Sequence, residues 1–212
     1  MIKGVIFDVG GVLARDVWEP MFTALARRTR LSGARLQRVG EQLWREYDRR
    51  AGDVATLERE YWRKFRRRVR GLPASLTVER LMAMSDRFIR PVDAPAMRPL
   101  LARLKRKGVR LAICSNNNEF WFPRQYYWLG LDEFFARENV VLSCHEGTVK
   151  AARDFRMFLA AARRLALQPR QCLVIDDRAP YLERAGEHGM RALLFPTGGV
   201  RVLDRQLRGL GL

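Results

Sequence analysis

Hydrophobic positions along the chain follow two periods that alternate. Short apolar runs typical of buried strands occur at residues 4–7, 109–114, 140–142, 172–175 and 191–195. Segments with apolar residues three or four positions apart, typical of helices, separate most of these runs, at about 96–107, 120–135, 150–167 and 180–188, and a last one covers 198–212. Such alternation is typical of a parallel sheet covered by helices on both faces. The sequence therefore predicts an α/β fold with a doubly wound, mainly parallel, Rossmann-like sheet.

A long helical segment interrupts the alternation directly after the first strand. Helical spacing of apolar residues recurs twice in it, at Leu36, Val39, Leu43 and Tyr47 and at Val54, Leu57, Tyr61 and Phe65. At about residue 91 the chain returns to the alternating pattern. We therefore expect an α/β core of residues 1–16 and 91–212 and a helical unit of residues 17–90 inserted into it.

Polar residues stand where three of the expected strands end. Asp8 follows the first strand, Ser115 and Asn116 follow the second, and the pair Asp176-Asp177 follows the fourth. In a doubly wound sheet, ligands bind in the crevice outside the carboxyl ends of the strands. Each feature alone has an ordinary explanation, such as a turn or a helix cap. Their conjunction predicts a site at this edge.

The chemistry of these residues suits a magnesium ion and a phosphate. Carboxylate oxygens are the hard ligands that magnesium prefers, and hydroxyl, amide and ammonium groups donate to a phosphate. Lys150, at the start of the expected helix 150–167, adds an ammonium group. Gly10 and Gly11 let the backbone turn close to whatever Asp8 holds.

Four segments resemble the motifs of the haloacid dehalogenase superfamily of hydrolases. Residues 7–13 (FDVGGVL) are similar to its first motif, 113–116 (ICSN) to its second, 147–150 (GTVK) to its third and 174–177 (VIDD) to its fourth. The resemblance covers nearly the full chain, and residues 17–90 lie where this superfamily carries a small helical cap. The pattern looks most like the subgroup that includes the bacterial α-D-glucose-1-phosphate phosphatase and the phosphatase domain of soluble epoxide hydrolase.

This resemblance implies a Mg²⁺-dependent phosphatase that acts on a small phosphorylated metabolite. Asp8 would attack phosphorus to form an aspartyl-phosphate, which water then hydrolyses. By the same resemblance the catalytic residues are Asp8, Ser115 and Lys150; the substrate-binding residues are Gly10, Gly11, Ser115, Asn116 and Lys150; and the metal-binding residues are Asp8, Asp176, Asp177 and the backbone carbonyl of Gly10.

Three positions depart from the superfamily pattern. Most phosphatases of the superfamily have a second Asp two residues after the nucleophile, where this chain has Gly10; Ala151 replaces a usual proline, and Tyr181 a frequent Asn. The second Asp shuttles protons, and losing such assistance costs about 10²- to 10⁴-fold in rate. We therefore expect a preference for good leaving groups, such as those of sugar 1-phosphates, acyl phosphates or aryl phosphates.

Two alternatives remain open from the sequence. One is a catalytically degenerate member of the superfamily that binds phosphorylated ligands or nucleic acid through a basic surface. The other is a metal-independent 2-haloacid dehalogenase, which also lacks the second Asp but does not usually keep a paired acid such as Asp176-Asp177.

Charge gives the nucleic-acid alternative its main support. With 40 Lys and Arg against 23 Asp and Glu, the net charge is +17. The basic peak lies at residues 61–70 (YWRKFRRRVR), where arginines interleave with aromatic residues that could stack on bases. At helical spacing we favour a helix whose arginines face solvent and whose aromatic residues face inward.

The remaining features predict little chemistry. No apolar run is long enough to span a bilayer, and no signal peptide precedes the first strand, so we expect a cytoplasmic protein without membrane partners. Cys114, Cys144 and Cys172 fit neither a disulfide framework nor a zinc site. His145 and His188 lack metal-ligand spacing and are expected to be structural or exposed.

Overall fold

The computed structural model describes residues 1–196 and 199–212. Its strands are β1 (Gly4–Phe7), β2 (Arg110–Ser115), β3 (Val140–Leu142), β4 (Cys172–Asp176) and β5 (Arg191–Leu194). Its α-helices are α1 (Trp18–Thr29), α2 (Gly33–Tyr47), α3 (Val54–Arg68), α4 (Val78–Asp86), α5 (Ala94–Arg106), α6 (Phe122–Trp128), α7 (Ser143–Glu146), α8 (Arg156–Arg164), α9 (Ala179–Glu187) and α10 (Gly199–Gly209). Short 3-10 turns lie at Leu131–Glu133, Arg137–Asn139 and Pro169–Gln171.

The five strands form one sheet in the order β3-β2-β1-β4-β5, and every neighbouring pair is parallel. The predicted α/β fold with a doubly wound parallel sheet is confirmed. Because β1 lies between β2 and β4, the carboxyl ends of these three strands are neighbours. This order places the residues that follow β1, β2 and β4 beside one another.

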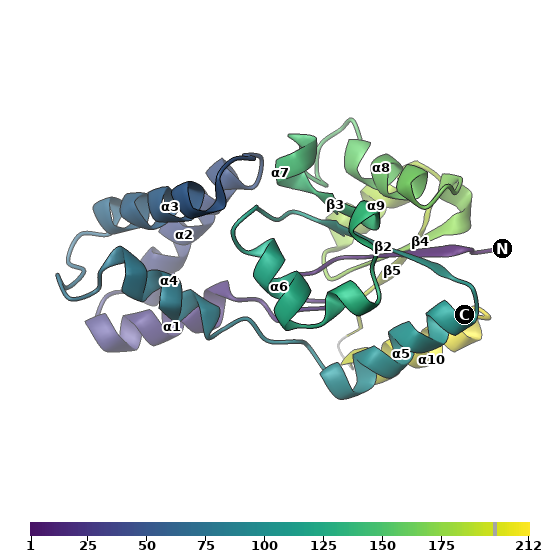
Figure 1. The fold of residues 1–212 in the computed structure, drawn as a ribbon, viewed down its shortest axis with the longest axis horizontal. Helices are drawn as coiled ribbons and strands as arrows, with labels where there is room; N and C mark the ends of the chain where they lie inside the picture. Colours follow the sequence, from purple (N-terminus) through teal and green to yellow (C-terminus); the bar gives the residue numbers. More distant parts are fainter. Residues whose placement is uncertain (197–198) are drawn as a thin grey trace.

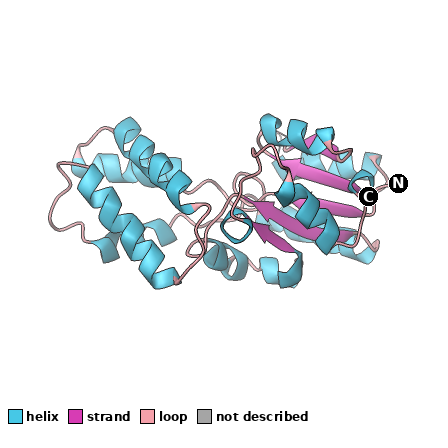
Figure 2. Ribbon diagram, turned by 90° about the horizontal axis from the view of Figure 1, so that it is seen from above, coloured by secondary structure: helices cyan, strands magenta, loops and turns pink. Residues whose placement is uncertain are grey.

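Both faces of the sheet are covered by helices (Figures 1 and 2). Val5 and Phe7 of β1 point to the face that packs against α5 and α10, whereas Ile6 points to the face that packs against α8 and α9. The central strands are therefore buried on both sides, which explains why they read as continuous apolar runs.

Helices α1 to α4 pack around a hydrophobic cluster of their own, away from the sheet (Figure 1). Met21, Phe22, Leu43, Tyr61 and Phe65 lie at its centre with no more than 1% of their surface exposed. The apolar stripes of α2 and α3 predicted these contacts. Two residues of the loop between β2 and α6, Phe120 and Trp121, also belong to this cluster. The loop that follows the second strand thus packs on the helical unit.

The basic segment at residues 61–70 lies on α3 and just beyond it. Tyr61, Trp62 and Phe65 are fully buried, and Arg63 and Arg67 are exposed. The inward orientation of the aromatic residues is confirmed, so these rings are not available to stack on nucleic-acid bases. None of the helices among the described residues is both long and apolar enough to cross a membrane.

Two helices differ from the sequence prediction, and one predicted boundary is not described. The helix expected to begin at Lys150 begins at Arg156, because residues 147–155 form turns in which Gly147 and Phe155 adopt positive φ angles of 64° and 52°. The helical stretch expected at 120–135 is broken at Gly130, whose φ is 65°. The expected start of the last helix, Gly198, lies outside the described residues.

Candidate active site

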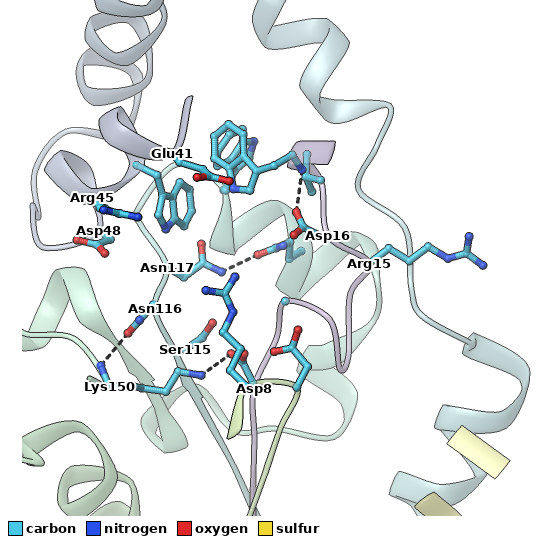
Figure 3. Close-up of a pocket in the computed structure, with 18 of the residues that line it drawn as sticks. Asp8, Arg15, Asp16, Glu41, Arg45, Asp48, Ser115, Asn116, Asn117 and Lys150 are labelled. Atoms are coloured by element: carbon cyan, nitrogen blue, oxygen red, sulfur yellow. Dashed lines mark hydrogen bonds and ion pairs between the residues drawn. The ribbon is translucent and has the colours of Figure 1, made fainter. Parts of the chain in front are cut away.

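The ends of β1, β2 and β4 bring the predicted polar residues together (Figure 3). Asp8 follows β1 directly, Ser115 is the last residue of β2, and Asp176 is the last residue of β4. Asp8 and Ser115 are 8% and 2% exposed, and both line one cavity with a volume of about 300 Å³. The sheet register therefore delivers one carboxylate and one hydroxyl to the same cavity.

Lys150 reaches this cavity from the turn after α7. Its side chain is only 1% exposed, and its Nζ lies 3.0 Å from Oδ1 of Asp8 and 2.5 Å from Oδ2 of Asp176. Its backbone N–H donates to Oδ1 of Asn116 at 2.9 Å. The lysine is thus fixed at both ends, although the helix predicted to begin at this residue does not form.

Burial and charge together set the titration of these groups. Burial raises the pKa of Asp8 to about 6, with Lys150 opposing the shift and Asp176 adding to it. Burial acts against the charged form of Lys150, but Asp8 and Asp176 outweigh it and raise the pKa of the ammonium group above its ordinary value. Burial and Asp176 also raise the pKa of Asp177. The site therefore concentrates negative charge that a further cation would stabilise.

The two glycines after Asp8 differ in what they do. Gly11 has a φ of +75°, and a Cβ on it would lie 2.3 Å from Oδ2 of Asp177. Gly11 therefore lets the loop after β1 approach the loop after β4. Gly10 lines the cavity, and a Cβ on it would meet no atom within 4 Å. The close approach expected of both glycines is needed only at Gly11.

Three carboxylates could hold a metal ion. Oxygen atoms of Asp8, Asp176 and Asp177 lie within 4.8 Å of one another. An all-oxygen set with several negative charges fits magnesium better than a softer metal. The residues present therefore fit the ion that the sequence resemblance implies.

Most predicted site residues share the cavity. Asp8, Gly10, Ser115, Asn116, Lys150 and Asp177 line it. The other two do not: Asp176 is buried behind Lys150, and Gly11 lies against Asp177. Asp176 thereby contacts the lysine directly, and its Oδ1 accepts a hydrogen bond from the backbone N–H of Arg178 at 2.9 Å.

Several lining residues were missed by the sequence analysis. Asn117 donates from its side chain to Oε1 of Gln125 at 2.7 Å, and its backbone N–H donates to Oγ of Ser143 at 3.0 Å. Arg178 and Tyr181 line the cavity, and the side chain of Asn116 donates to the Tyr181 hydroxyl at 3.3 Å. Asn117 and Arg178 directly follow motif residues, and that position was the signal available in the sequence.

The helical unit supplies the far wall of the cavity. Gln37, Glu41, Trp44, Arg45 and Asp48 line it from α2 and the residue after that helix, and Trp18 and Trp121 line it as well. In Figure 3, Glu41, Arg45 and Asp48 lie on the side opposite Ser115, Lys150 and Asp8, and the side chain of Arg15 points away from them. Helical spacing of polar residues on α2 was the only sequence signal for this wall.

A second group of possible ligands lies outside the cavity. Ligand atoms of Glu119, Cys144 and His145 lie within 4.8 Å of one another, and His145 is exposed, as expected from the sequence. The contact joins residues 26 positions apart in the sequence, with Nε2 of His145 2.7 Å from Oε1 of Glu119. Burial raises the pKa of the Cys144 thiol to about 12, which keeps it protonated and a poor ligand. We interpret the group as a hydrogen-bonded pair of His145 and Glu119 next to a buried thiol.

The sequence matches the haloacid dehalogenase-like hydrolases over residues 2–184, which include all the motif residues described above. The chain belongs to this family of hydrolases. All the residues of the candidate site lie within the matched segment. Membership in the haloacid dehalogenase-like family confirms the resemblance inferred from the four motifs, whereas the subgroup within it stays a prediction.

Curated proteins similar to this haloacid dehalogenase-like chain include a phosphatase, MT3486, of Mycobacterium tuberculosis. The two are 32% identical over 106 residues, which are 50% of this chain and 47% of that protein. The chain thus spans about half the length of this curated relative.

Two solved structures share the fold. A HAD family enzyme of Bacteroides thetaiotaomicron, in complex with magnesium and inorganic phosphate, has a TM-score of 0.66 at 18% identity, covering 93% of this chain and 96% of its own. An L-2-haloacid dehalogenase of Xanthobacter autotrophicus has a TM-score of 0.65 at 22% identity, covering 99% and 83%. Since this fold carries both kinds of enzyme, the site has to decide the reaction.

Proposed function

We propose that this protein is a magnesium-dependent phosphatase that hydrolyses a small phosphorylated metabolite through an aspartyl-phosphate on Asp8. The observation that carries the proposal is the convergence of Asp8, Lys150 and the acids Asp176 and Asp177 at one strand edge. The similarity to a named phosphatase supports the same reaction class.

In this mechanism a carboxylate oxygen of Asp8 forms a bond to phosphorus while the bond from phosphorus to the leaving oxygen breaks. Lys150, Ser115 and the Asn116 amide donate to the phosphoryl oxygens and offset their charge in the transition state. Water then attacks phosphorus, the bond to Asp8 breaks, and inorganic phosphate leaves.

Magnesium would be held by Asp8, Asp177 and the Gly10 carbonyl, with Asp176 beside them, and when bound it would supply positive charge that offsets the phosphoryl group. Asp176 also orients Lys150, since their contact is 2.5 Å and both side chains are buried. We further propose that residues 17–90 act as a cap, because their helices form the wall of the cavity opposite Asp8.

Gly10 shapes the substrate range in this proposal. Gly10 has no acidic side chain that could protonate the leaving oxygen, so in this mechanism the proton comes from solvent. Good leaving groups, as in aryl, acyl or sugar 1-phosphates, should therefore react faster than simple alkyl phosphates.

Hydrolysis of p-nitrophenyl phosphate tests the function directly. We expect turnover in the presence of Mg²⁺, loss of activity with a chelator, and loss in Asp8→Asn, which keeps the size of the side chain but removes the nucleophile. Release of chloride from 2-chloropropionate without metal would instead establish a dehalogenase. No turnover of either compound, with salt-dependent binding of nucleic acid, would establish the degenerate binding protein.

A further inference from the structure

The wall of the cavity opposite Asp8 has the chemistry of a binding site for hydroxyl groups. It is built on one face of α2, where Gln37, Glu41, Arg45 and Asp48 follow one another at intervals of four, four and three residues. Such spacing places side chains on a single face of a helix. Leu36, Leu43 and Tyr47 are buried in the helical cluster on another face of α2. The polar face of this helix is thereby directed at the cavity.

Asp48 is the residue on this face that most needs a partner. Its surface is only 6% exposed, yet its Oδ1 has no hydrogen-bond partner among the described residues. The nearest cation, Nε of Arg49, lies 3.9 Å from that oxygen, beyond hydrogen-bond distance. Buried carboxylate oxygens are nearly always satisfied by a donor. Asp48 also lines the cavity, so a substrate hydroxyl there would give this carboxylate group a donor that the described residues do not supply.

Neighbouring groups indicate which donor fits. Arg45 lies beside Asp48 in Figure 3 and partly offsets its charge, so the missing donor need not be a cation. A hydroxyl both donates and accepts, and it can therefore pair with Asp48 and Arg45 together. Glu41 on the same face disfavours a second anionic group. Trp44 and Trp121 add aromatic surface, against which the C–H groups of a sugar or polyol can pack.

We propose that this face of α2 is the leaving-group subsite, and that Asp48 there binds a hydroxyl of a polyhydroxylated phosphate ester, a sugar or polyol phosphate. The proposal rests on the proposed function, because it assigns the phosphoryl group to the Asp8 end of the same cavity. Asp48 acts here as a specificity-determining residue that touches the substrate away from phosphorus.

A pair of alkyl phosphates that differ in their hydroxyls tests the subsite. Glucose 6-phosphate and n-hexyl phosphate are both phosphate esters of primary alcohols, so their leaving groups have similar reactivity. The ratio of kcat/KM for glucose 6-phosphate to kcat/KM for n-hexyl phosphate therefore reports the contacts to the hydroxyl groups. We expect the wild-type protein to favour glucose 6-phosphate by about 10-fold or more, since a site built to bind hydroxyls rejects an analogue without them. Asp48→Ala should lower this ratio by about 10-fold, mainly through KM.

Two controls separate a binding role from a structural one. Glu46→Ala removes another carboxylate from α2, one that pairs with Arg68 and Lys64 and does not line the cavity, and it should leave the ratio unchanged. In Asp48→Ala, kcat/KM for p-nitrophenyl phosphate, which has no hydroxyl, should fall less than kcat/KM for glucose 6-phosphate. A parallel fall on all three compounds would overturn the proposal, as would an unchanged ratio. A preference for ethanolamine phosphate over both alkyl esters would also overturn it, in favour of a cation.

Failure of the phosphatase itself would be recognised separately. In that case p-nitrophenyl phosphate is not hydrolysed with Mg²⁺, and the subsite is tested by binding instead. Calorimetric titration of Asp8→Asn with glucose 6-phosphate should give about 10-fold weaker binding when Asp48→Ala is added. Equal binding by the two proteins would overturn the subsite, whatever the reaction.

Discussion

Gly10 occupies a position that has room for a larger side chain. A Cβ there would meet no atom within 4 Å, and the φ angle of Gly10 lies outside the left-handed region that favours glycine. Neither packing nor backbone conformation therefore demands glycine at this position. In the proposed mechanism its effect is chemical, because position 10 offers no acid to the leaving oxygen.

Replacing Gly10 by Asp should restore this proton donor. We expect Gly10→Asp to raise kcat on simple alkyl phosphates by about 10²-fold, and to raise it much less on p-nitrophenyl phosphate, whose leaving group needs little protonation. Initial rates on both compounds measure the effect. Gly10→Asn is the matched control, since its amide has the same size and cannot shuttle a proton. Equal gains from Asp and Asn would refute the interpretation.

Ionisation of Asp48 should lower the stability of the fold as the pH rises from about 4 to about 6. Burial raises its pKa to about 6, although Arg49 and Arg45 oppose the shift, whereas the unfolded chain has the ordinary value of about 3.9. The contribution of this carboxyl to stability is therefore fully present below about pH 4 and is lost as the pH rises towards 6. Asn at this position cannot ionise and escapes the loss.

We accordingly expect Asp48→Asn to gain stability relative to the wild-type protein between pH 4.5 and pH 7.5, by an amount on the order of 2 kcal/mol. Urea unfolding of both proteins at the two pH values measures the difference. A stability difference that is the same at both pH values would show that the carboxyl titrates normally in the folded protein.

Among the elements, α6 is joined to the helical unit by one buried ion pair. Arg124 of α6 donates through Nη1 and Nη2 to the two carboxylate oxygens of Glu58 on α3, at 2.7 Å each, and it also lies 3.3 Å from Asp86 of α4. Glu58 is only 1% exposed. Since α6 follows the loop that carries Asn116 and Asn117, this pair ties the helical unit to the loop at the end of β2.

Removing one partner of this pair should cost far more than removing both. Arg124→Met leaves the Glu58 carboxylate buried and unpaired, and we expect it to lower the free energy of unfolding by about 3 to 5 kcal/mol. The double variant Arg124→Met/Glu58→Met should recover most of that loss. Arg59→Met is the exposed control, because its 2.9 Å pair with Glu79 is open to solvent and should contribute less than about 1 kcal/mol. Chemical unfolding of the three variants measures these free energies. A double variant as unstable as Arg124→Met alone would contradict the expectation.

The elements also show what the sequence could and could not predict. Asp8, Ser115 and Asp176 were predictable because the strand ends that carry them are fixed by apolar runs, and parallel order brings those ends together. The turn that carries Lys150 was not predictable, because the helical spacing of apolar residues in α8 continues towards the N-terminus past Phe155. The positive φ of 52° at Phe155 has no signal in the sequence.

The wall of the cavity was harder still to predict. Glu41 and Asp48 have the same helical spacing as residues on any solvated helix face, and nothing local shows that this face meets the ends of the strands. The pair of Arg124 and Glu58 joins residues 66 positions apart in a chain that has 40 basic residues to choose from. Such contacts depend on how the helical unit packs against the sheet. No short sequence pattern indicates that packing.

At the scale of the whole molecule, the net charge of +17 should make the folded state repel itself. Two effects of salt compete. Screening weakens exposed ion pairs, such as Lys64 with Glu60 and Arg208 with Asp204, but each of these contributes at most about 1 kcal/mol. Screening also weakens the repulsion among cations, and with 23 acids for 40 bases at least 17 cations have no acid of their own. The second effect should therefore prevail.

We expect the melting temperature to rise as NaCl increases from 20 to 300 mM, over which the screening length falls from about 20 Å to about 6 Å. Differential scanning calorimetry measures the rise, and a double variant, Arg63→Glu/Arg67→Glu, serves as the comparison because both residues are exposed on α3. It lowers the net charge by four, so its melting temperature should depend less on salt. A melting temperature that falls with salt would mean that the ion pairs outweigh the repulsion, and that the basic charge is locally balanced within the fold.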